Sequence, residues 1–238
     1  MDFGCYLAMT AGEFSAWAQI CAKPAWMACH YASYSPGLSN LPTGLPRGAM
    51  VIVNDRIPPA GHSASLIAEQ LQQLCQRASV EAVLLDLQRP GYAENEALVR
   101  AVTEALPCPV GVSSLYARAP ACPVFVSCPA PHVTLAAHLA PWKGRELWLE
   151  LATETEQAVV TAEGAKFCTL AAENVSLGFT DEKLHCRYGT KIFDDRAVFT
   201  LHRGQAELAA LLREAKAAGV SRVIGLYQQL GTNFPGDL

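Results

Sequence analysis

The segment from Ala82 to Arg89 carries the residues best suited to chemistry. A short apolar run ends there in Asp86, Leu87 and Gln88. Such an ending is typical of a buried parallel strand whose carboxyl end opens into a site. Asp86 and Gln88 are two residues apart, so their side chains lie on one face of the strand. Asp86 could act in catalysis or binding, or it could cap the loop that leaves the strand.

A second carboxylate, Glu150, stands near the end of another apolar run, Leu-Trp-Leu-Glu-Leu at 147–151. If Glu150 faces inward, it could form with Asp86 the pair of carboxyls that retaining glycosidases use, about 5 Å apart. If it faces outward, it is a helix-facing or surface residue. The alternation of side chains leaves both orientations open.

Two further candidates follow other apolar runs. Asp55 lies between Asn54 and Arg56, directly after a predicted strand. It could line a binding site or make an ion pair within its loop. Tyr31 lies near the end of an earlier strand, where an aromatic ring could stack on a sugar or anchor the core.

These residues need a scaffold, and eight short apolar segments supply it. Most are rich in β-branched or aromatic residues and several are followed by turn formers, which is typical of strands buried on both faces of a parallel sheet. The predicted strands are Cys5–Met9, Trp26–Ser33, Met50–Asn54, Ala82–Leu87, Val110–Ser114, Val124–Cys128, Leu147–Leu151 and Arg222–Tyr227.

Helical patterns lie between only some of these strands. One helix follows the third strand, with Ser63 or Ser65 as its N-cap, and a second follows the fourth strand and ends at Pro107. A third precedes the last strand and ends at Gly219, where a left-handed cap is expected. The proline-rich segment 107–131 predicts loops or single turns.

Residues 167–202 alternate between polar and apolar types and predict a β-rich insertion after the seventh strand. We therefore expect an α/β fold: one domain over residues 1–238, formed by a (β/α)₈ barrel like that of triosephosphate isomerase (TIM barrel), with reduced outer helices.

Composition excludes several classes of protein. The chain is 51% hydrophobic, only 17% charged, and carries a net charge of -4, which argues against a nucleic-acid partner. No apolar run approaches a membrane span of about 20 residues, and no signal peptide is evident. Nine cysteines without a C-x-x-C pair favour reduced thiols and a cytoplasmic location. The histidine spacing predicts no metal site, and the lack of nucleotide-binding motifs predicts no cofactor.

Two segments together resemble glycoside hydrolase family 18, the chitinase-like TIM barrels, and above all its spore-associated bacterial branch. The first is 71–90. The second is 188–231, which contains K-I-F-D-D at 191–195 and G-V-S-R-V-I-G-L-Y-Q-Q-L-G at 219–231. The two segments cover roughly a third of the chain.

The resemblance departs from the family at the chemistry. The family's catalytic strand reads D-x-x-D-x-D-x-E, and residues 81–88 here read E-A-V-L-L-D-L-Q. Asp86 matches the last Asp, whereas Leu84 replaces the middle Asp and Gln88 replaces the Glu that protonates the glycosidic oxygen. Glutamine cannot give up a proton, although its amide can hydrogen-bond a sugar. The Trp that forms the floor under the sugar falls on Leu226 or Tyr227.

Three functions follow as hypotheses. The first is a family 18-like barrel that lacks chitinase activity and binds a glycan or another small polar ligand. Its candidate ligand-binding residues are Gln88, Tyr227, Gln229, Asp55 and Tyr31. The second is an active glycoside hydrolase that uses Asp86 and Glu150 as a relocated carboxylate pair. The third is a structural or assembly protein, for instance of a spore or envelope complex, with a vestigial site.

Overall fold

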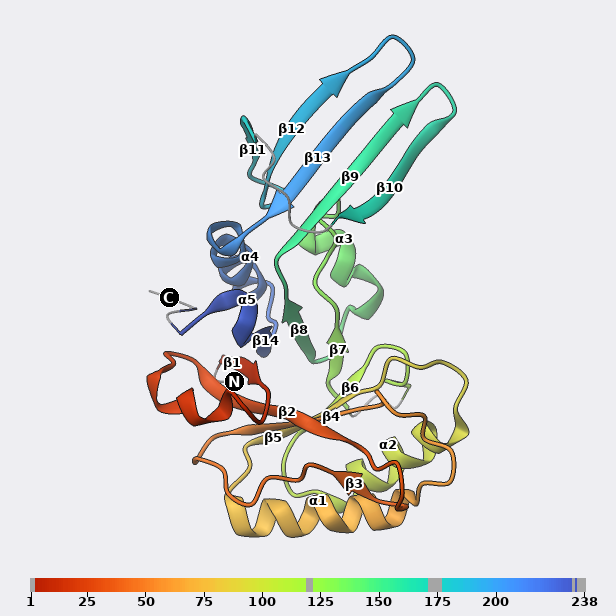
Figure 1. The fold of residues 1–238 in the computed structure, drawn as a ribbon, viewed down its shortest axis with the longest axis vertical. Helices are drawn as coiled ribbons and strands as arrows, with labels where there is room; N and C mark the ends of the chain where they lie inside the picture. Colours follow the sequence, from red (N-terminus) through yellow and green to blue (C-terminus); the bar gives the residue numbers. More distant parts are fainter. Residues whose placement is uncertain (1–2, 119–121, 171–176, 233, 235–238) are drawn as a thin grey trace.

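Eight parallel strands close into a barrel in the computed structural model, which describes residues 3–118, 122–170, 177–232 and 234 (Figure 1). The first strand pairs with both the last and the second, which closes the ring. This confirms the predicted (β/α)₈ class and all eight strands. They are β1 (Gly4–Met9), β2 (Lys23–Tyr31), β4 (Met50–Asn54), β5 (Ala82–Asp86), β6 (Val110–Ser113), β7 (Val124–Val126), β8 (Leu147–Leu151) and β14 (Arg222–Leu226).

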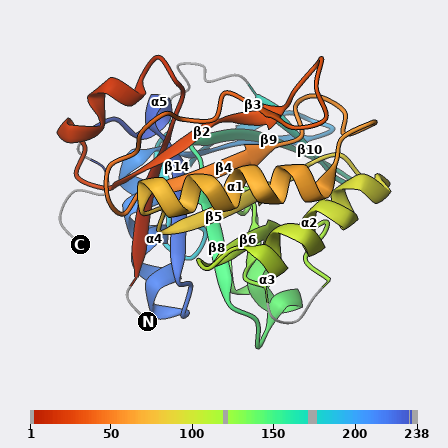
Figure 2. The same cartoon turned by 90° about the horizontal axis from the view of Figure 1, so that it is seen from below.

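The three predicted helices are present: α1 (Ala64–Ala78), α2 (Ala93–Ala105) and α4 (Gln205–Ala217). Figure 2 shows α1 and α2 side by side on the outside of the barrel. The Ser63 hydroxyl caps α1 by accepting from the Leu66 amide, and Gly219 adopts a φ of 84° just after α4. In the described part of the chain, no helix is both long and apolar enough to cross a bilayer.

The outer layer is thin between β6 and β8, as the prolines predicted. The described residues there form only α3 (Leu135–Leu139) and the 3₁₀ turn η2 (Ala140–Trp142); residues 119–121 lie outside the described part. Other short elements are η1 (Phe14–Gln19), β3 (Leu38–Ser39) and α5 (Tyr227–Leu230). The prediction that the last strand includes Tyr227 is wrong, because α5 begins at that residue.

A five-stranded antiparallel sheet follows β8 and projects from the barrel (Figure 1). Its strands are β9 (Glu154–Thr161), β10 (Gly164–Leu170), β11 (Phe179–Asp181), β12 (Cys186–Ile192) and β13 (Ala197–Arg203). This confirms the predicted β-rich insertion, of which residues 171–176 lie outside the described part. The predicted start at residue 167 is wrong: β9 begins earlier, and its polar opening Glu-Thr-Glu-Gln gave no apolar alternation to detect.

A fully buried arginine joins the insertion to the barrel. Arg203, at the end of β13, donates from Nε to the carbonyl of His185 (3.1 Å) and from Nη2 to that of Leu184 (2.7 Å). Its Nη1 donates to the carbonyl of Pro129, just beyond β7. A buried guanidinium is tolerated only when its donors are satisfied, so this set of carbonyls fixes the base of the insertion against the barrel.

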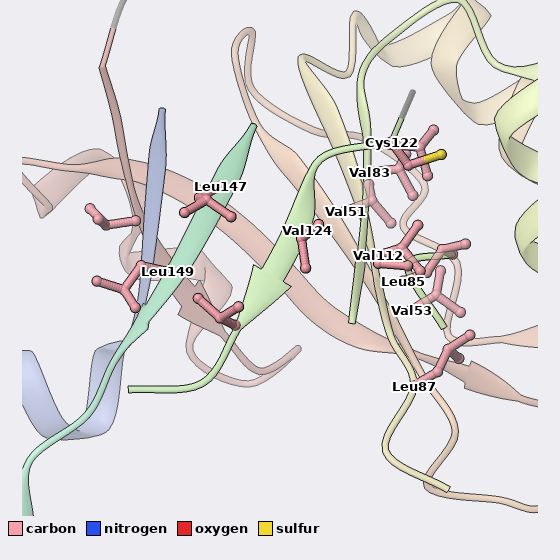
Figure 3. Close-up of a cluster of buried hydrophobic side chains, with 14 of the residues drawn as sticks. Val51, Val53, Val83, Leu85, Leu87, Val112, Cys122, Val124, Leu147 and Leu149 are labelled. Atoms are coloured by element: carbon pink, nitrogen blue, oxygen red, sulfur yellow. The ribbon is translucent and has the colours of Figure 1, made fainter. Parts of the chain in front are cut away.

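Alternate residues of each barrel strand build two separate cores. Outward-facing residues, such as Val83 and Leu85 of β5, pack under the helices in a continuous layer (Figure 3). The residues between them face the barrel axis and form a smaller inner core. Its buried members are Tyr6, Ala8, Ala25, Met50, Ile52, Ala82, Leu84, Phe125, Trp148 and Ile224.

Trp148 occupies the space in the inner core that a side chain at position 111 would need. Its indole is fully buried and lies over Gly111 of β6, so that a Cβ built on Gly111 would lie 2.2 Å from Trp148 Cε3. No real side chain tolerates that separation. Trp148 therefore requires glycine at position 111.

We expect Gly111→Ala to lower the free energy of unfolding by about 1–3 kcal/mol, because the added methyl overpacks the barrel interior. Urea denaturation measures the change. Gly12→Ala is the matched control, since a Cβ there meets no atom within 4 Å. Equal stability of the two variants would show that the indole can move aside at no cost.

Candidate functional site

The carboxyl ends of β4 and β5 open onto a cleft of about 630 Å³. This is the end of the barrel at which enzymes with this architecture build their sites. Most of the side chains that line the cleft are polar. The lining residues are Thr10, Met27, Ala28, His30, Asn40, Asn54, Asp55, Arg56, Asp86, Gln88 and Arg89.

Asp86 and Gln88 come together in this cleft. Leu84 belongs to the inner core, so alternation places Asp86 on the inner face at the end of β5. The Gln88 side-chain amide donates to Asp86 Oδ1, and the Ser113 hydroxyl of β6 lies 3.5 Å from the same oxygen. Asp86 and Gln88 therefore meet in the cleft, and the carboxylate holds the amide in place.

The surroundings of Asp86 favour its protonated form. Burial raises the pKa of this carboxyl, and the negative charge of Asp55 raises it further. The hydrogen bonds from Gln88 and Ser113 oppose the increase without cancelling it. A carboxyl whose pKa is raised can hold a proton nearer neutral pH, as a general acid must.

Glu150 faces the barrel interior. It lies two residues after Trp148, which belongs to the inner core, and thus points to the same side of β8. Burial raises the pKa of Glu150, and the charge of Asp86 also contributes to the increase. Its Oε2 accepts from the Cys128 amide at 3.4 Å. Of the two orientations that the sequence left open, Glu150 therefore has the inward one, which a carboxylate pair requires.

Asp55 does not offer its carboxylate to a ligand. The residue is only 3% exposed. Oδ1 accepts from the Gln88 backbone amide at 2.9 Å, and Oδ2 accepts from the Arg89 amide at 2.8 Å and from Asn95 Nδ2 at 3.1 Å. Asp55 lines the cleft, as one of the two sequence-based alternatives has it, but its carboxylate oxygens are occupied by the loop after β5, which they hold in place.

Tyr31 is likewise part of this support. Its side chain is 1% exposed, and its hydroxyl donates to Asn95 Oδ1 at 2.6 Å. Asn95 in turn donates to Asp55. The prediction that Tyr31 stacks on a ligand is wrong, because its position in β2 turns the ring into the outer core.

Tyr227 and Gln229 lie away from the cleft lining. β14 ends at Leu226, which packs against the inner core, and Tyr227 then turns outward and packs against the outer core. Gln229 Oε1 accepts from the Thr153 amide at 3.0 Å. Neither Tyr227 nor Gln229, both candidate ligand-binding residues in the sequence, lines the cleft with Gln88, since the chain becomes helical directly after Leu226.

Sequence reasoning missed several lining residues, among them a histidine–asparagine pair. Asn40 Nδ2 lies 3.1 Å from His30 Nε2, and His30 Nδ1 lies 2.8 Å from the carbonyl of Tyr31. If the asparagine amide donates, Nε2 is the acceptor and the ring proton is on Nδ1. His30 was visible at the end of a predicted strand, whereas nothing in the long loop marked Asn40.

The described residues contain no group of three or more His, Cys, Asp or Glu side chains that could hold a metal ion. The side chains at the cleft offer hydrogen bonds and charge, and Asp86 adds a carboxyl whose pKa is raised by burial. Such a set can bind a polar ligand or transfer protons.

Comparison with known proteins finds likeness in structure alone. No family model matches the chain, and no curated protein sequence is significantly similar to it. A family 18 N-acetylglucosaminidase from Paenibacillus barengoltzii superposes with a TM-score of 0.61 at 11% identity, covering 98% of this chain and 97% of that one. The spore cortex-lytic enzyme SleL of Bacillus cereus gives 0.58 at 10% identity, with coverages of 98% and 72%.

A family 18 chitinase from Cycas revoluta, solved in complex with (GlcNAc)3, gives a TM-score of 0.59 at 11% identity and covers 94% of this chain and 95% of its own. At identities this low the likeness shows the fold alone, and that fold is like the one found in glycoside hydrolase family 18. The resemblance seen in the sequence is confirmed at that level.

We expect Asp55→Asn to destabilise the protein by about 1–3 kcal/mol, because an amide cannot accept from the Gln88 and Arg89 backbone and from Asn95 at once. Thermal unfolding measures the loss. Asp194→Asn, at an exposed position of the insertion, is the control for the change of charge. A melting temperature equal to that of the control would show that water replaces the lost bonds.

Glu150→Gln should raise the melting temperature at neutral pH. A pKa raised above the ordinary 4.5 means that the folded protein binds the proton more tightly than the unfolded chain, so stability falls as pH rises through the raised value. The variant has no ionisable group at this position, so its stability does not fall over this pH range. Its advantage should shrink as the pH falls through the raised pKa and should be gone below 4.5, and melting curves from pH 4 to 8 would show whether it does.

Proposed function

We propose that this protein binds a glycan in the cleft at the end of β4 and β5 and does not cleave chitin. One observation carries the proposal: Gln88 lies on the inner face of the barrel mouth, two residues after Asp86, with its amide bonded to that carboxylate. In the family that the sequence resembles, the proton donor occupies this place. An amide there can bind a sugar and cannot protonate one.

The character of the cleft supports a saccharide ligand. Sugars present many hydroxyl groups, and the lining offers amides from Asn40, Asn54 and Gln88 together with the Thr10 hydroxyl. These groups both donate and accept hydrogen bonds. A volume of about 630 Å³ lies within the range of small-ligand sites. The fold neighbours point to the same class, since one of them was solved with (GlcNAc)3.

A relocated carboxylate pair is the second candidate, and the orientation of Glu150 favours it. Glu150 and Asp86 both face the interior, and the charge of Asp86 raises the pKa of Glu150. One carboxyl could then donate a proton while the other stays ionised, as glycosidases require. Such an enzyme would act on a bond that lies deeper in the barrel than Gln88.

An assembly role with a vestigial site has less support. A vestigial mouth would be filled by side chains, whereas here it opens into the cleft. Large apolar side chains are exposed on the insertion, at Val160, Phe167, Phe179, Ile192 and Phe193. These residues belong to the projecting insertion, so their exposure does not argue against a ligand at the mouth of the barrel.

We expect no release of sugars when the purified protein is incubated with the tetrasaccharide (GlcNAc)4, because loss of a general acid typically costs about 10²–10⁴-fold in rate. Gln88→Glu should not restore cleavage, since Leu84 still replaces the family's supporting Asp. Product analysis by mass spectrometry checks both the wild-type protein and the Gln88→Glu variant. Turnover by the wild type that Asp86→Asn or Glu150→Gln abolishes would establish the carboxylate-pair alternative instead.

Binding is tested in parallel by a thermal-shift screen of neutral and charged oligosaccharides. A ligand at 100 times its Kd stabilises the native state by about 2.7 kcal/mol. Asp86→Ala should abolish the shift while leaving the melting temperature of the free protein nearly unchanged. If that variant instead melts far lower and still binds, Asp86 is a structural cap.

A further inference from the structure

Two arginines line the same cleft without a carboxylate partner. Arg56 follows β4 and Arg89 follows β5, and both side chains are exposed. None of the ion pairs found in the described part of the chain involves either residue. Two guanidinium groups thus lie at one polar cleft without an ion-pair partner among the described residues, in a chain whose net charge is -4.

Arg89 is held in position by neutral partners. Its Nε donates to the carbonyl of Asp55 at 2.8 Å and its Nη2 to the carbonyl of Arg56 at 3.0 Å. These bonds orient the guanidinium while leaving its charge intact. No hydrogen bond was found in the described residues for its Nη1 donors. A guanidinium fixed in this way loses little entropy when it binds an anion.

The acidic residues of the cleft offset this charge only in part. Asp55 is buried, and its carboxylate oxygens accept hydrogen bonds from the loop and from Asn95. Asp86 lies at the inner end of the cleft, bonded to Gln88, in surroundings that disfavour its ionised form. The solvent-facing rim of the cleft thus presents positive charge to a ligand.

We infer that the glycan bound in this cleft is acidic, with a sugar carboxylate that pairs with Arg56 and Arg89. This rests on the proposed function and narrows it to a class of ligand. Guanidinium groups match the planar carboxylate with two parallel hydrogen bonds, which a neutral hydroxyl cannot accept equally well. Asn40 Nδ2 already bonds to His30 and Asn54 Nδ2 to the carbonyl of Met27, and the second hydrogen of each amide can bind the uncharged part of the sugar.

The experiment compares three tetrasaccharides by calorimetry in 50 mM salt. One is neutral (GlcNAc)4, one alternates N-acetylglucosamine with glucuronic acid, and one is the second compound with its carboxyls reduced to alcohols. We expect the acidic compound to bind about tenfold more tightly than its reduced form. Arg56→Gln should remove that difference, and 500 mM salt should weaken it.

Arg213→Gln is the matched control, because it removes one exposed positive charge from α4 and should leave the tenfold preference intact. Arg89→Lys is the second variant: it keeps the charge, loses the planar fork and should weaken the acidic ligand alone. Inorganic sulfate should compete only weakly, since it lacks the sugar. Competition by sulfate as strong as by the acidic tetrasaccharide would overturn the sugar carboxylate as the ligand.

The outcomes separate the inference from the function on which it rests. If (GlcNAc)4 and the reduced compound bind as tightly as the acidic one, the cleft binds glycans and the acidic class is wrong. If Arg56→Gln leaves the preference unchanged, the assignment of the carboxylate to this cleft is wrong. If none of the three sugars binds, glycan binding itself fails, and the inference fails with it.

Discussion

The carboxylate of Asp55 is the group on which the site depends. It is buried, and none of the ion pairs among the described residues involves it, so hydrogen bonds must offset the cost of removing it from water. Three donors supply them: the backbone amides of Gln88 and Arg89 and the side chain of Asn95. The same bonds fix the loop that carries Gln88 into the cleft and Arg89 to its rim. The charge of Asp55 also adds to the increase that burial causes in the pKa of Asp86, so one buried group fixes the loop and contributes to the electrostatics of the neighbouring carboxyl.

Closure of the barrel determines which residues can meet inside it. Because β1 pairs with both β2 and β14, each strand has one face toward the axis and one toward the outer layer. Leu84 and Trp148 fill the inner core, and Asp86 and Glu150, each two residues further along, lie above them. The carboxyls are thus placed over an apolar floor, and their burial is the main reason that the pKa of each is raised.

The barrel strands could be predicted because burial on both faces leaves a local signature, a short apolar run with turn formers after it. The same reasoning found the caps at Ser63 and Gly219. It failed where the outcome depended on distant partners. Asp55 and Tyr31 have the residue types of a binding site, yet both side chains hydrogen-bond to Asn95, which is far from them in the sequence. The assignment of Tyr227 to the last strand was wrong for a local reason. The chain changes from strand to helix between Leu226 and Tyr227, and neither residue is a glycine or a proline that would mark the change.

The insertion enters and leaves the barrel at a single place. Glu154, where β9 begins, is paired in register with Arg203, where β13 ends, so the two connections to the barrel lie side by side. A segment with neighbouring ends can be gained or lost in evolution without reordering the strands around it. The barrel and the projecting sheet can therefore diverge at separate rates, each under its own selection. Arg203 hydrogen-bonds to carbonyls of both parts, so a change of backbone position in one part would alter its contacts with the other.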